Sequence, residues 1–116
     1  MIEWIKSLLG MTPPVKIQAE RSPKWPAARA KHLKLFPTCA ACGGKENLEV
    51  HHVWPFSWPG GDESELEEGN LLTLCESAAH RCHLVVGHLS DWKSRNPNAR
   101  QDAAAWLAKI QTRPYP

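Results

Sequence analysis

Apolar side chains recur at the spacing of a helix in several parts of the chain, and the first of these is the N-terminus. Four apolar residues there predict a short helix: Ile2, Ile5, Leu8 and Leu9. Gly10 and two nearby prolines would end it. Residues 12–26 contain four prolines and show no periodicity, which predicts a linker or an arm that lies on the surface.

Residues 27–36 predict a second helix. Pro26 suits the first turn of a helix, because the N–H that proline lacks is not needed there. Ala30, Leu33 and Phe36 share one side of this helix, while its basic residues lie largely elsewhere. The pattern therefore predicts a basic helix just before the first cysteine.

The middle and the end of the chain predict a strand, a loop and two further helices. Residues 48–53 alternate enough for a strand, and the proline- and glycine-rich residues 54–61 predict a loop. Residues 70–74 lead into a turn that carries cysteines. Residues 82–89 predict a helix and residues 98–111 a longer one. The apolar face of that last helix consists of Ala99, Ala103, Trp106 and Ile110.

The length and composition favour one α+β domain. The chain has 116 residues, and a single core typically organises about 100 to 150. No run approaches the ~18 apolar residues of a membrane helix, so we expect no membrane segment. Glu3 and Lys6 interrupt the apolar N-terminus and no small-residue cleavage pattern follows it. A secretory signal therefore fits poorly, and we expect a cytoplasmic protein.

The net charge of +2 hides a strong segregation along the sequence. Residues 1–38 carry +5, residues 39–75 carry −6 and residues 76–116 carry +3. Basic flanks around a central site suit a polyanionic partner, because phosphate contacts dominate nucleic-acid binding. An ordinary solvated surface would give the same totals. The candidates for phosphate contact lie on or just before the predicted basic helix, whose charged face could equally be only solvated: Lys24, Arg29, Lys31 and Lys34.

The four cysteines are spaced like metal ligands. Two residues separate Cys39 from Cys42, so both sulfurs can reach one ion, and the glycines that follow permit a tight turn. Cys75 and Cys82 would complete a closed, structural zinc site, since thiols are kept reduced in the cytoplasm. The chain must bulge between this second pair, and His80 in the bulge could replace Cys82 as a ligand. Four unrelated buried thiols or a redox pair are the alternatives.

Several aromatic residues have two interpretations. Trp54 and Trp58 flank Phe56 in the predicted loop, where they could stack on nucleic acid or pack a small core. Trp92 and Trp106 lie in the C-terminal region and are predicted to be core contacts.

Three further stretches of sequence lie between the cysteine pairs and at the end of the second pair. They comprise Leu48-Glu49-Val50-His51-His52-Val53, Asn70-Leu71-Leu72-Thr73-Leu74-Cys75 and Cys82-His83. In this order, and with the two cysteine pairs, they resemble the HNH endonuclease family over residues 39–88, less than half of the chain. Gly87-His88, Trp92 and Asn96-Pro97 also look like the phage-type branch of that family. The resemblance implies a treble-clef-like ββα-metal core, in which an antiparallel hairpin and a helix surround one catalytic divalent ion.

The resemblance implies a role for each matching residue. His52 matches the general base that takes a proton from the attacking water, which a neutral imidazole can do near pH 7. Asn70 matches the middle letter of the motif and would tie loop backbone so that the base is oriented. His51 and His83 match ligands of the catalytic ion. Because neighbours on a strand point to opposite faces, His51 and His52 can serve one centre only if the strand end is twisted or broken.

Some members of the family take a further ligand from one turn along the helix, and His88 is the candidate here. Five residues advance an α-helix by about 500°, which leaves His83 and His88 ~140° apart. His88 can join the site only if Gly87 distorts the helix. Otherwise His88 is a helix-end histidine that contacts carbonyls or phosphate.

These expectations combine into a metal-dependent HNH endonuclease that hydrolyses DNA phosphodiester bonds. Zinc in the cysteine site would be structural, and the histidine site would hold an exchangeable ion, foremost Mg²⁺, with Mn²⁺, Ni²⁺ or Zn²⁺ also suited. The single domain would consist of a basic helical arm (1–38), an HNH core (39–89) and a C-terminal helical extension (90–116). Monomer or homodimer, and nicking or double-strand cleavage, stay open. The alternative function is a zinc-stapled module that binds nucleic acid or protein and cuts nothing.

Overall fold

The computed structural model of this chain describes residues 21–112. The helix predicted at the N-terminus and the linker residues before Arg21 lie outside the described residues. Within them the chain is a small α+β protein built on a two-stranded sheet, as the sequence predicts.

The two strands pair antiparallel at the centre of the molecule. Strand β1 spans Leu48–His52 and strand β2 spans Leu71–Cys75. Leu48 lies opposite Cys75, and His52 lies opposite Leu71. Every residue of β2 is buried, so this strand is the middle of the fold. The strand predicted over residues 48–53 is confirmed to within one residue.

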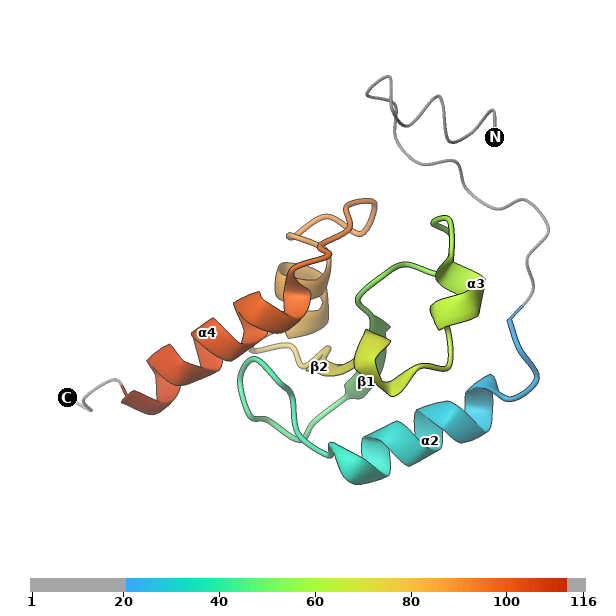
Figure 1. The fold of residues 1–116 in the computed structure, drawn as a ribbon. Coiled ribbons are helices and arrows are strands. Elements are labelled where there is room, and N and C mark those ends of the chain that lie inside the picture. The colour runs from blue at the N-terminus through green and yellow to red at the C-terminus, as the bar shows by residue number, and fades with distance from the viewer. Residues whose placement is uncertain (1–20, 113–116) are drawn as a thin grey trace, which may run out of the picture.

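Helical segments surround the pair of strands. They are α2 (Trp25–Leu35), α3 (Gly61–Ser64), the 3₁₀ turn η1 (Glu68–Asn70), the π-helix η2 (His83–Gly87) and α4 (Ala99–Thr112). Figure 1 shows α2 and α4 on different sides of the strands, with α3 and η1 in the connection between β1 and β2. The predicted helices at 27–36 and 98–111 are confirmed with boundaries shifted by one or two residues.

Helix α2 packs through a different face from the one its apolar residues predict. His32 is its buried residue, and the Trp25 ring lies 4.5 Å from the His52 ring, centroid to centroid. Ala30 and Phe36, two of the three residues on the predicted apolar side, are exposed. The helix meets an acidic part of the chain, so ion pairs and an aromatic contact, rather than an apolar stripe, decide which side faces inward.

The core is small and contains much sulfur. Its buried residues are Cys39, Ala41, Leu72, Leu74, Cys75, Cys82, Ala99 and Ala103. Helix α4 contributes only its first two turns, since Trp106 and Ile110 are 49% and 41% exposed. The apolar face predicted for α4 is therefore wrong beyond Ala103, because the helix runs outward past the body that its first turns cover (Figure 1).

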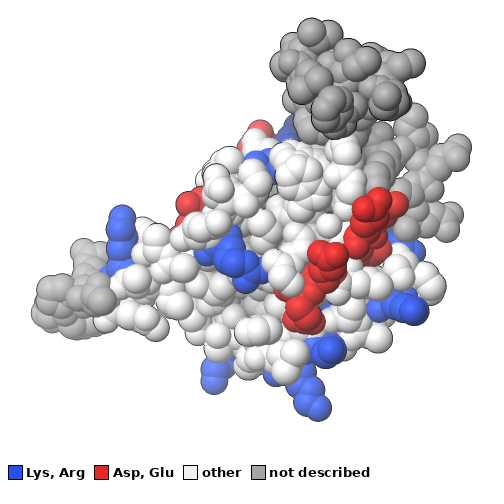
Figure 2. Space-filling view, viewed as in Figure 1, with Lys and Arg blue, Asp and Glu red and all other residues white. Residues whose placement is uncertain are grey.

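Charged side chains are segregated on the surface as they are in the sequence. Figure 2 shows acidic side chains gathered over α3 and η1, and basic side chains along α2. Among the described residues, no helix combines the length and the apolar character needed to cross a membrane.

Candidate metal centres

Four cysteine sulfurs come together beneath the end of β2. The Sγ atoms of Cys39, Cys42, Cys75 and Cys82 all lie within 4.8 Å of one another. The turn after Cys39 is tight because Gly43 adopts a left-handed φ of 77°, and the N–H of Gly44 donates to Cys42 Sγ at 3.4 Å. This cluster could bind a metal ion such as zinc. His80 is exposed on the loop between the second pair and is not part of the cluster.

The environment of the four thiols differs from one to the next. Burial raises the pKa of Cys75, but hydrogen bonds to Ser77 and from the Cys82 backbone outweigh it and lower the pKa to about 6. Burial raises the pKa of Cys42 to about 11, and burial together with neighbouring cysteines raises the pKa of Cys82. Cys75 is thus the thiolate ready at neutral pH, and a bound cation would displace the protons of Cys42 and Cys82.

Three imidazoles form a second cluster. Ring nitrogens of His51, His83 and His88 lie within 4.8 Å of one another, and this group could also hold a metal ion. His51 comes from β1, His83 begins η2, and His88 follows its last residue. His83 Nε2 lies 3.1 Å from His51 Nδ1, which is the spacing of neighbouring ligands around an ion with metal–nitrogen distances of about 2.1 Å.

The π-helical geometry of η2 explains how His88 reaches the cluster. In a π-helix the hydrogen bonds join residues five apart, so positions 83 and 88 lie on the same side of the widened turn. Gly87 makes room for this arrangement. A Cβ at this position would lie 3.1 Å from Cε1 of His51 and 3.2 Å from Cδ2 of His83. The side-chain separation of ~140° expected on a regular α-helix therefore does not apply here.

Two outer contacts fix the protons on these rings. His83 Nδ1 lies 2.8 Å from Glu76 Oε1, and His88 Nδ1 lies 2.9 Å from the carbonyl oxygen of Ser94. Both oxygens only accept, so each Nδ1 carries the proton and each Nε2 keeps its lone pair. Carboxylate or carbonyl partners of this kind are the usual orienting contacts of metal-binding histidines.

Two rings of the cluster, His51 and His88, are held neutral at physiological pH. Burial, with the neighbouring His83 and His88, lowers the pKa of His51 to about 3. Burial also lowers the pKa of His88. His51 is 5% exposed, and its Nε2 is buried without a hydrogen-bond partner among residues 21–112. A neutral imidazole is the form that binds a metal ion.

His52 lies on the other side of β1 from His51. Its Nε2 is 3.0 Å from the carbonyl oxygen of Glu65, so Nε2 donates and Nδ1 is left as the basic nitrogen. Burial lowers the pKa of His52, which keeps the ring neutral at pH 7. Although neighbouring strand residues diverge, both histidines line one cavity that extends around the end of the strand.

Asn70 holds the chain that follows β1. Its Oδ1 accepts the N–H of Trp54 at 2.6 Å, and its Nδ2 donates to the carbonyl oxygens of Trp54 and Ser64 at 3.1 and 3.2 Å. The side chain is buried, so these contacts replace water for three backbone groups. Asn70 therefore connects the loop after His52 to the segment that supplies the Glu65 carbonyl.

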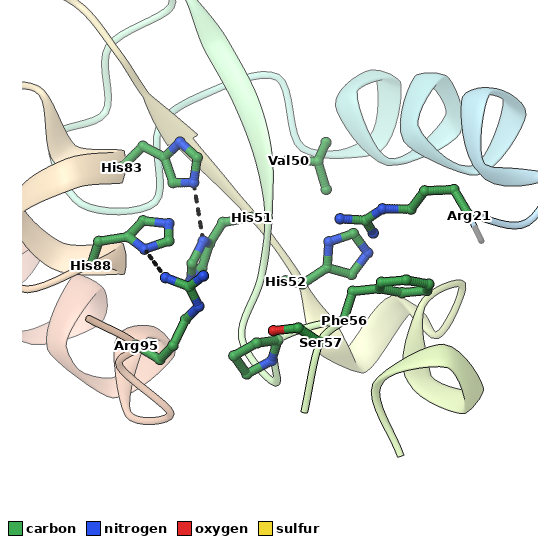
Figure 3. Close-up of a pocket in the computed structure, with 10 residues that line it drawn as sticks. Arg21, Val50, His51, His52, Phe56, Ser57, His83, His88 and Arg95 are labelled. Atoms are coloured by element: carbon green, nitrogen blue, oxygen red, sulfur yellow. Dashed lines mark hydrogen bonds between the residues drawn. The ribbon is translucent and has the colours of Figure 1, made fainter. Parts of the chain in front are cut away.

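One cavity of about 340 Å³ contains all four of these histidines. Figure 3 shows His51, His83 and His88 on one side of β1, with His52 on the other. Two arginines also line it, and the sequence analysis singled out neither as a site residue: Arg21 and Arg95. Arg95 Nη1 donates to the carbonyl oxygens of Trp92 and Ser94 at 2.7 and 3.0 Å. Its place follows from the turn after η2, where Leu89 and Ser90 adopt positive φ, and no local motif indicates it.

Trp92 belongs to the edge of this site, which corrects its prediction as a core contact. Its ring centroid lies 5.2 Å from that of His83 and 4.9 Å from that of His88, and the side chain is 46% exposed.

Trp54 and Trp58 contact each other edge to face at 4.9 Å, and Trp54 Nε1 donates to the carbonyl oxygen of Pro59.

The predicted phosphate-contacting residues lie along α2, away from the cavity lining. Lys24, Lys31 and Lys34 are exposed. Arg29 instead forms an ion pair with Glu49 at 3.0 Å.

Comparison with known proteins adds no relative: no protein-family model, curated protein or solved structure matches this chain.

Proposed function

We propose that this chain is a metal-dependent endonuclease with an HNH-type ββα-metal core, which hydrolyses phosphodiester bonds in DNA. One observation carries the proposal: three imidazoles converge on one point, and a fourth, oriented by a backbone carbonyl, lines the same cavity. A purely structural metal site has no use for that fourth histidine. The sequence resemblance to the HNH family, which includes the same histidines, agrees with this arrangement.

The two clusters would have separate duties. Four thiolates around an ion leave no open position, so zinc bound by the cysteines would only hold the fold together. Three imidazoles leave positions free for water and substrate. A divalent ion there would supply Lewis-acid stabilisation to the phosphate and to the leaving oxygen.

The donor set bears on which ion is bound. Mg²⁺ prefers oxygen ligands, whereas imidazole suits Zn²⁺ and Ni²⁺, and Mn²⁺ lies between these two groups in its preference for nitrogen. His51, His83 and His88 offer three nitrogens. The proposal therefore moves Mg²⁺ behind Mn²⁺, Ni²⁺ and Zn²⁺ as the activating ion.

His52 would act as the general base. Its Nε2–H is committed to the Glu65 carbonyl, so Nδ1 takes the proton from the attacking water. The same carbonyl stabilises the imidazolium that forms, because it accepts the Nε2–H more strongly once the ring is charged. Asn70 connects the loop after His52 to the Ser64 backbone. This connection would keep the His52 ring next to the Glu65 carbonyl that orients it.

Arg95 would bind the phosphate that is cut. Its Nη1 is fixed by two backbone carbonyls, which leaves Nε and Nη2 for phosphate oxygens. A guanidinium whose position is set before the substrate arrives stabilises developing charge without reorganisation. Each chain carries one such cavity among its described residues, so one chain would cut one strand at a time.

The test is cleavage of supercoiled plasmid by zinc-loaded protein with Mn²⁺, Ni²⁺, Zn²⁺ or Mg²⁺ added, beside a chelator control. We expect nicked circles with the wild type and a rate about 10² to 10⁴ lower for His52→Ala. His80→Ala is the matched control, because His80 is an exposed histidine outside both clusters and should cut like the wild type.

Two results would contradict the proposal. Wild-type protein with both ions bound that cuts no DNA would favour the binding module that retains the zinc. Equal rates for His52→Ala and wild type would remove the general base and with it the proposed chemistry.

A further inference from the structure

Arg21 lies on the wall of the cavity opposite to Arg95. It lines the same cavity as His52, and Figure 3 shows its guanidinium beside the His52 ring, while Arg95 lies on the far side of β1 with His51 and His88. The proposed chemistry uses Arg95 and leaves Arg21 without a role. A second cation at the opposite end of the cavity could bind a second anionic group of the same substrate.

Contacts with three side chains hold the Arg21 guanidinium in place. Its Cζ lies 4.3 Å from the centroid of the Phe56 ring and 5.9 Å from that of Trp25. Its Nη1 lies 3.5 Å from Glu65 Oε2. The guanidinium thus lies over an aromatic face and is paired with a carboxylate at one nitrogen, so little further entropy is lost when a ligand binds.

The ion pair with Glu65 does not use up this side chain. The Glu65 side chain is 2% exposed and Arg21 is 50% exposed. Arginine has five N–H donors, and only one terminal nitrogen faces the carboxylate. Because Arg21 is half exposed and lines the cavity, its remaining N–H donors are available to a ligand there, with the planar, forked geometry that matches a phosphate.

We propose that Arg21 binds the phosphate next to the one that is cut. This inference rests on the proposed nuclease function and specifies its substrate. The site would take an internal phosphodiester whose strand continues into a neighbouring phosphate on the Arg21 side. An isolated phosphodiester or a bond at the very end of a strand on that side would be a poor substrate.

The decisive experiment replaces single phosphates of a short duplex with neutral methylphosphonates, one position at a time. Binding is measured with zinc-loaded protein and no second ion, and cleavage is measured with Mn²⁺. For the wild type, one position next to the cut phosphate should weaken both binding and cleavage about tenfold when neutralised. For Arg21→Ala, the native duplex should already show that loss, and neutralising the same position should add nothing.

Control variants separate this role from the support of Glu65. Arg21→Ala leaves a buried carboxylate without its cation. The double variant Arg21→Ala/Glu65→Gln removes both charges, and neutralising the phosphate next to the cut should cause no further loss of binding in it either. Lys109→Ala removes an exposed cation on α4 that does not line the cavity. Its methylphosphonate profile should match the wild type at the position next to the cut.

The outcomes distinguish this inference from the proposed function. If Arg21→Ala and the double variant still lose affinity at every neutralised position as the wild type does, Arg21 contacts no phosphate and the inference is wrong. If the wild type binds with the expected profile but cuts nothing, the nuclease proposal fails while the phosphate contact stands. The salt dependence of binding gives a second readout, since losing one phosphate contact should lower the slope by about one.

Discussion

His51 and His83 are 32 positions apart in the chain, yet Nδ1 of the first lies 3.1 Å from Nε2 of the second. Strand β1 delivers one ring and the π-helix η2 delivers the other. The proton arrangement at this contact is set from outside, because Glu76 accepts the Nδ1–H of His83. The properties of the metal site therefore depend also on residues such as Glu76, which contact a coordinating histidine but are not among the three residues that could bind the ion.

Replacing Glu76 should weaken metal binding without removing a ligand. The carboxylate orients His83 and makes its Nε2 more basic, and losing such a contact typically costs 10- to 100-fold in metal affinity. We expect Glu76→Gln to lower the affinity for Mn²⁺ by about that factor and to leave the cysteine-bound zinc in place. Calorimetric titration measures the first and elemental analysis the second. An unchanged Mn²⁺ affinity would mean that Glu76 is only a surface partner of His83.

Acid should destabilise the protein that lacks the second ion. The folded state holds His51 neutral with a pKa of about 3, whereas the unfolded chain binds a proton near its ordinary value of 6.5. The unfolded state thus gains protons first, so stability is intact above pH 6.5 and falls toward pH 3 by up to about 1.4 kcal/mol per pH unit. Urea unfolding between pH 5.5 and 7 should show a shallower pH dependence for His51→Gln than for the wild type. Parallel curves would contradict the burial argument.

Those parts of the structure that depend on local sequence could be predicted from it. The cysteine spacing led to the cluster of four sulfurs, and alternation located β1. The face of α2 could not be read in this way, because His32 is buried beside Glu68 by a polar contact that an apolar pattern does not contain. Periodicity identifies which side of a helix is apolar, and here the neighbouring acidic segment decides the packing instead.

Long-range packing placed the residues that were harder to foresee. Whether His88 reaches His83 depends on the π-helical widening of η2, where the absence of a side chain at Gly87 leaves room for the His51 ring. Arg21 and Arg95 reach the cavity from segments outside regular elements, held by Phe56 and by backbone carbonyls. No spacing rule connects these arginines to the histidines, so only the folded chain brings them together.

Removing a cysteine ligand should unfold the protein. Cys39 is fully buried in a core that is small and rich in sulfur, so little apolar packing remains to replace the metal. Zinc binding at such sites contributes about 10 to 16 kcal/mol, comparable to or larger than the ~5 to 15 kcal/mol stability of a whole domain. We expect about one tightly bound zinc per chain in the wild type, and a zinc-free, largely unfolded chain for Cys39→Ser by elemental analysis and circular dichroism. A folded Cys39→Ser would show that the apolar core suffices.

Truncating Asn70 should loosen the base and leave the ligands in place. Asn70→Ala deprives two backbone groups of Trp54 and one of Ser64 of their partners, which should cost about 2 to 3 kcal/mol in the free energy of unfolding. Because none of these contacts touches His83 or His88, the Mn²⁺ affinity should stay near the wild-type value while the cleavage rate falls. A variant that loses metal and rate together would place Asn70 in the support of the ion.

A single methyl group at position 87 should disturb the imidazole cluster. In Gly87→Ala the new Cβ would meet His51 Cε1 at 3.1 Å and Nδ1 and His83 Cδ2 at 3.2 Å, closer than ordinary contacts, so both rings must move. Crowding of this kind costs about 1 to 3 kcal/mol, equivalent to a loss of about 10- to 100-fold in Mn²⁺ affinity if the displacement falls on the ligands. Gly69→Ala is the matched control, since a Cβ there meets nothing within 4 Å. Titration with Mn²⁺ should therefore separate the two alanine variants, and equal affinities would show that the rings need no glycine beside them.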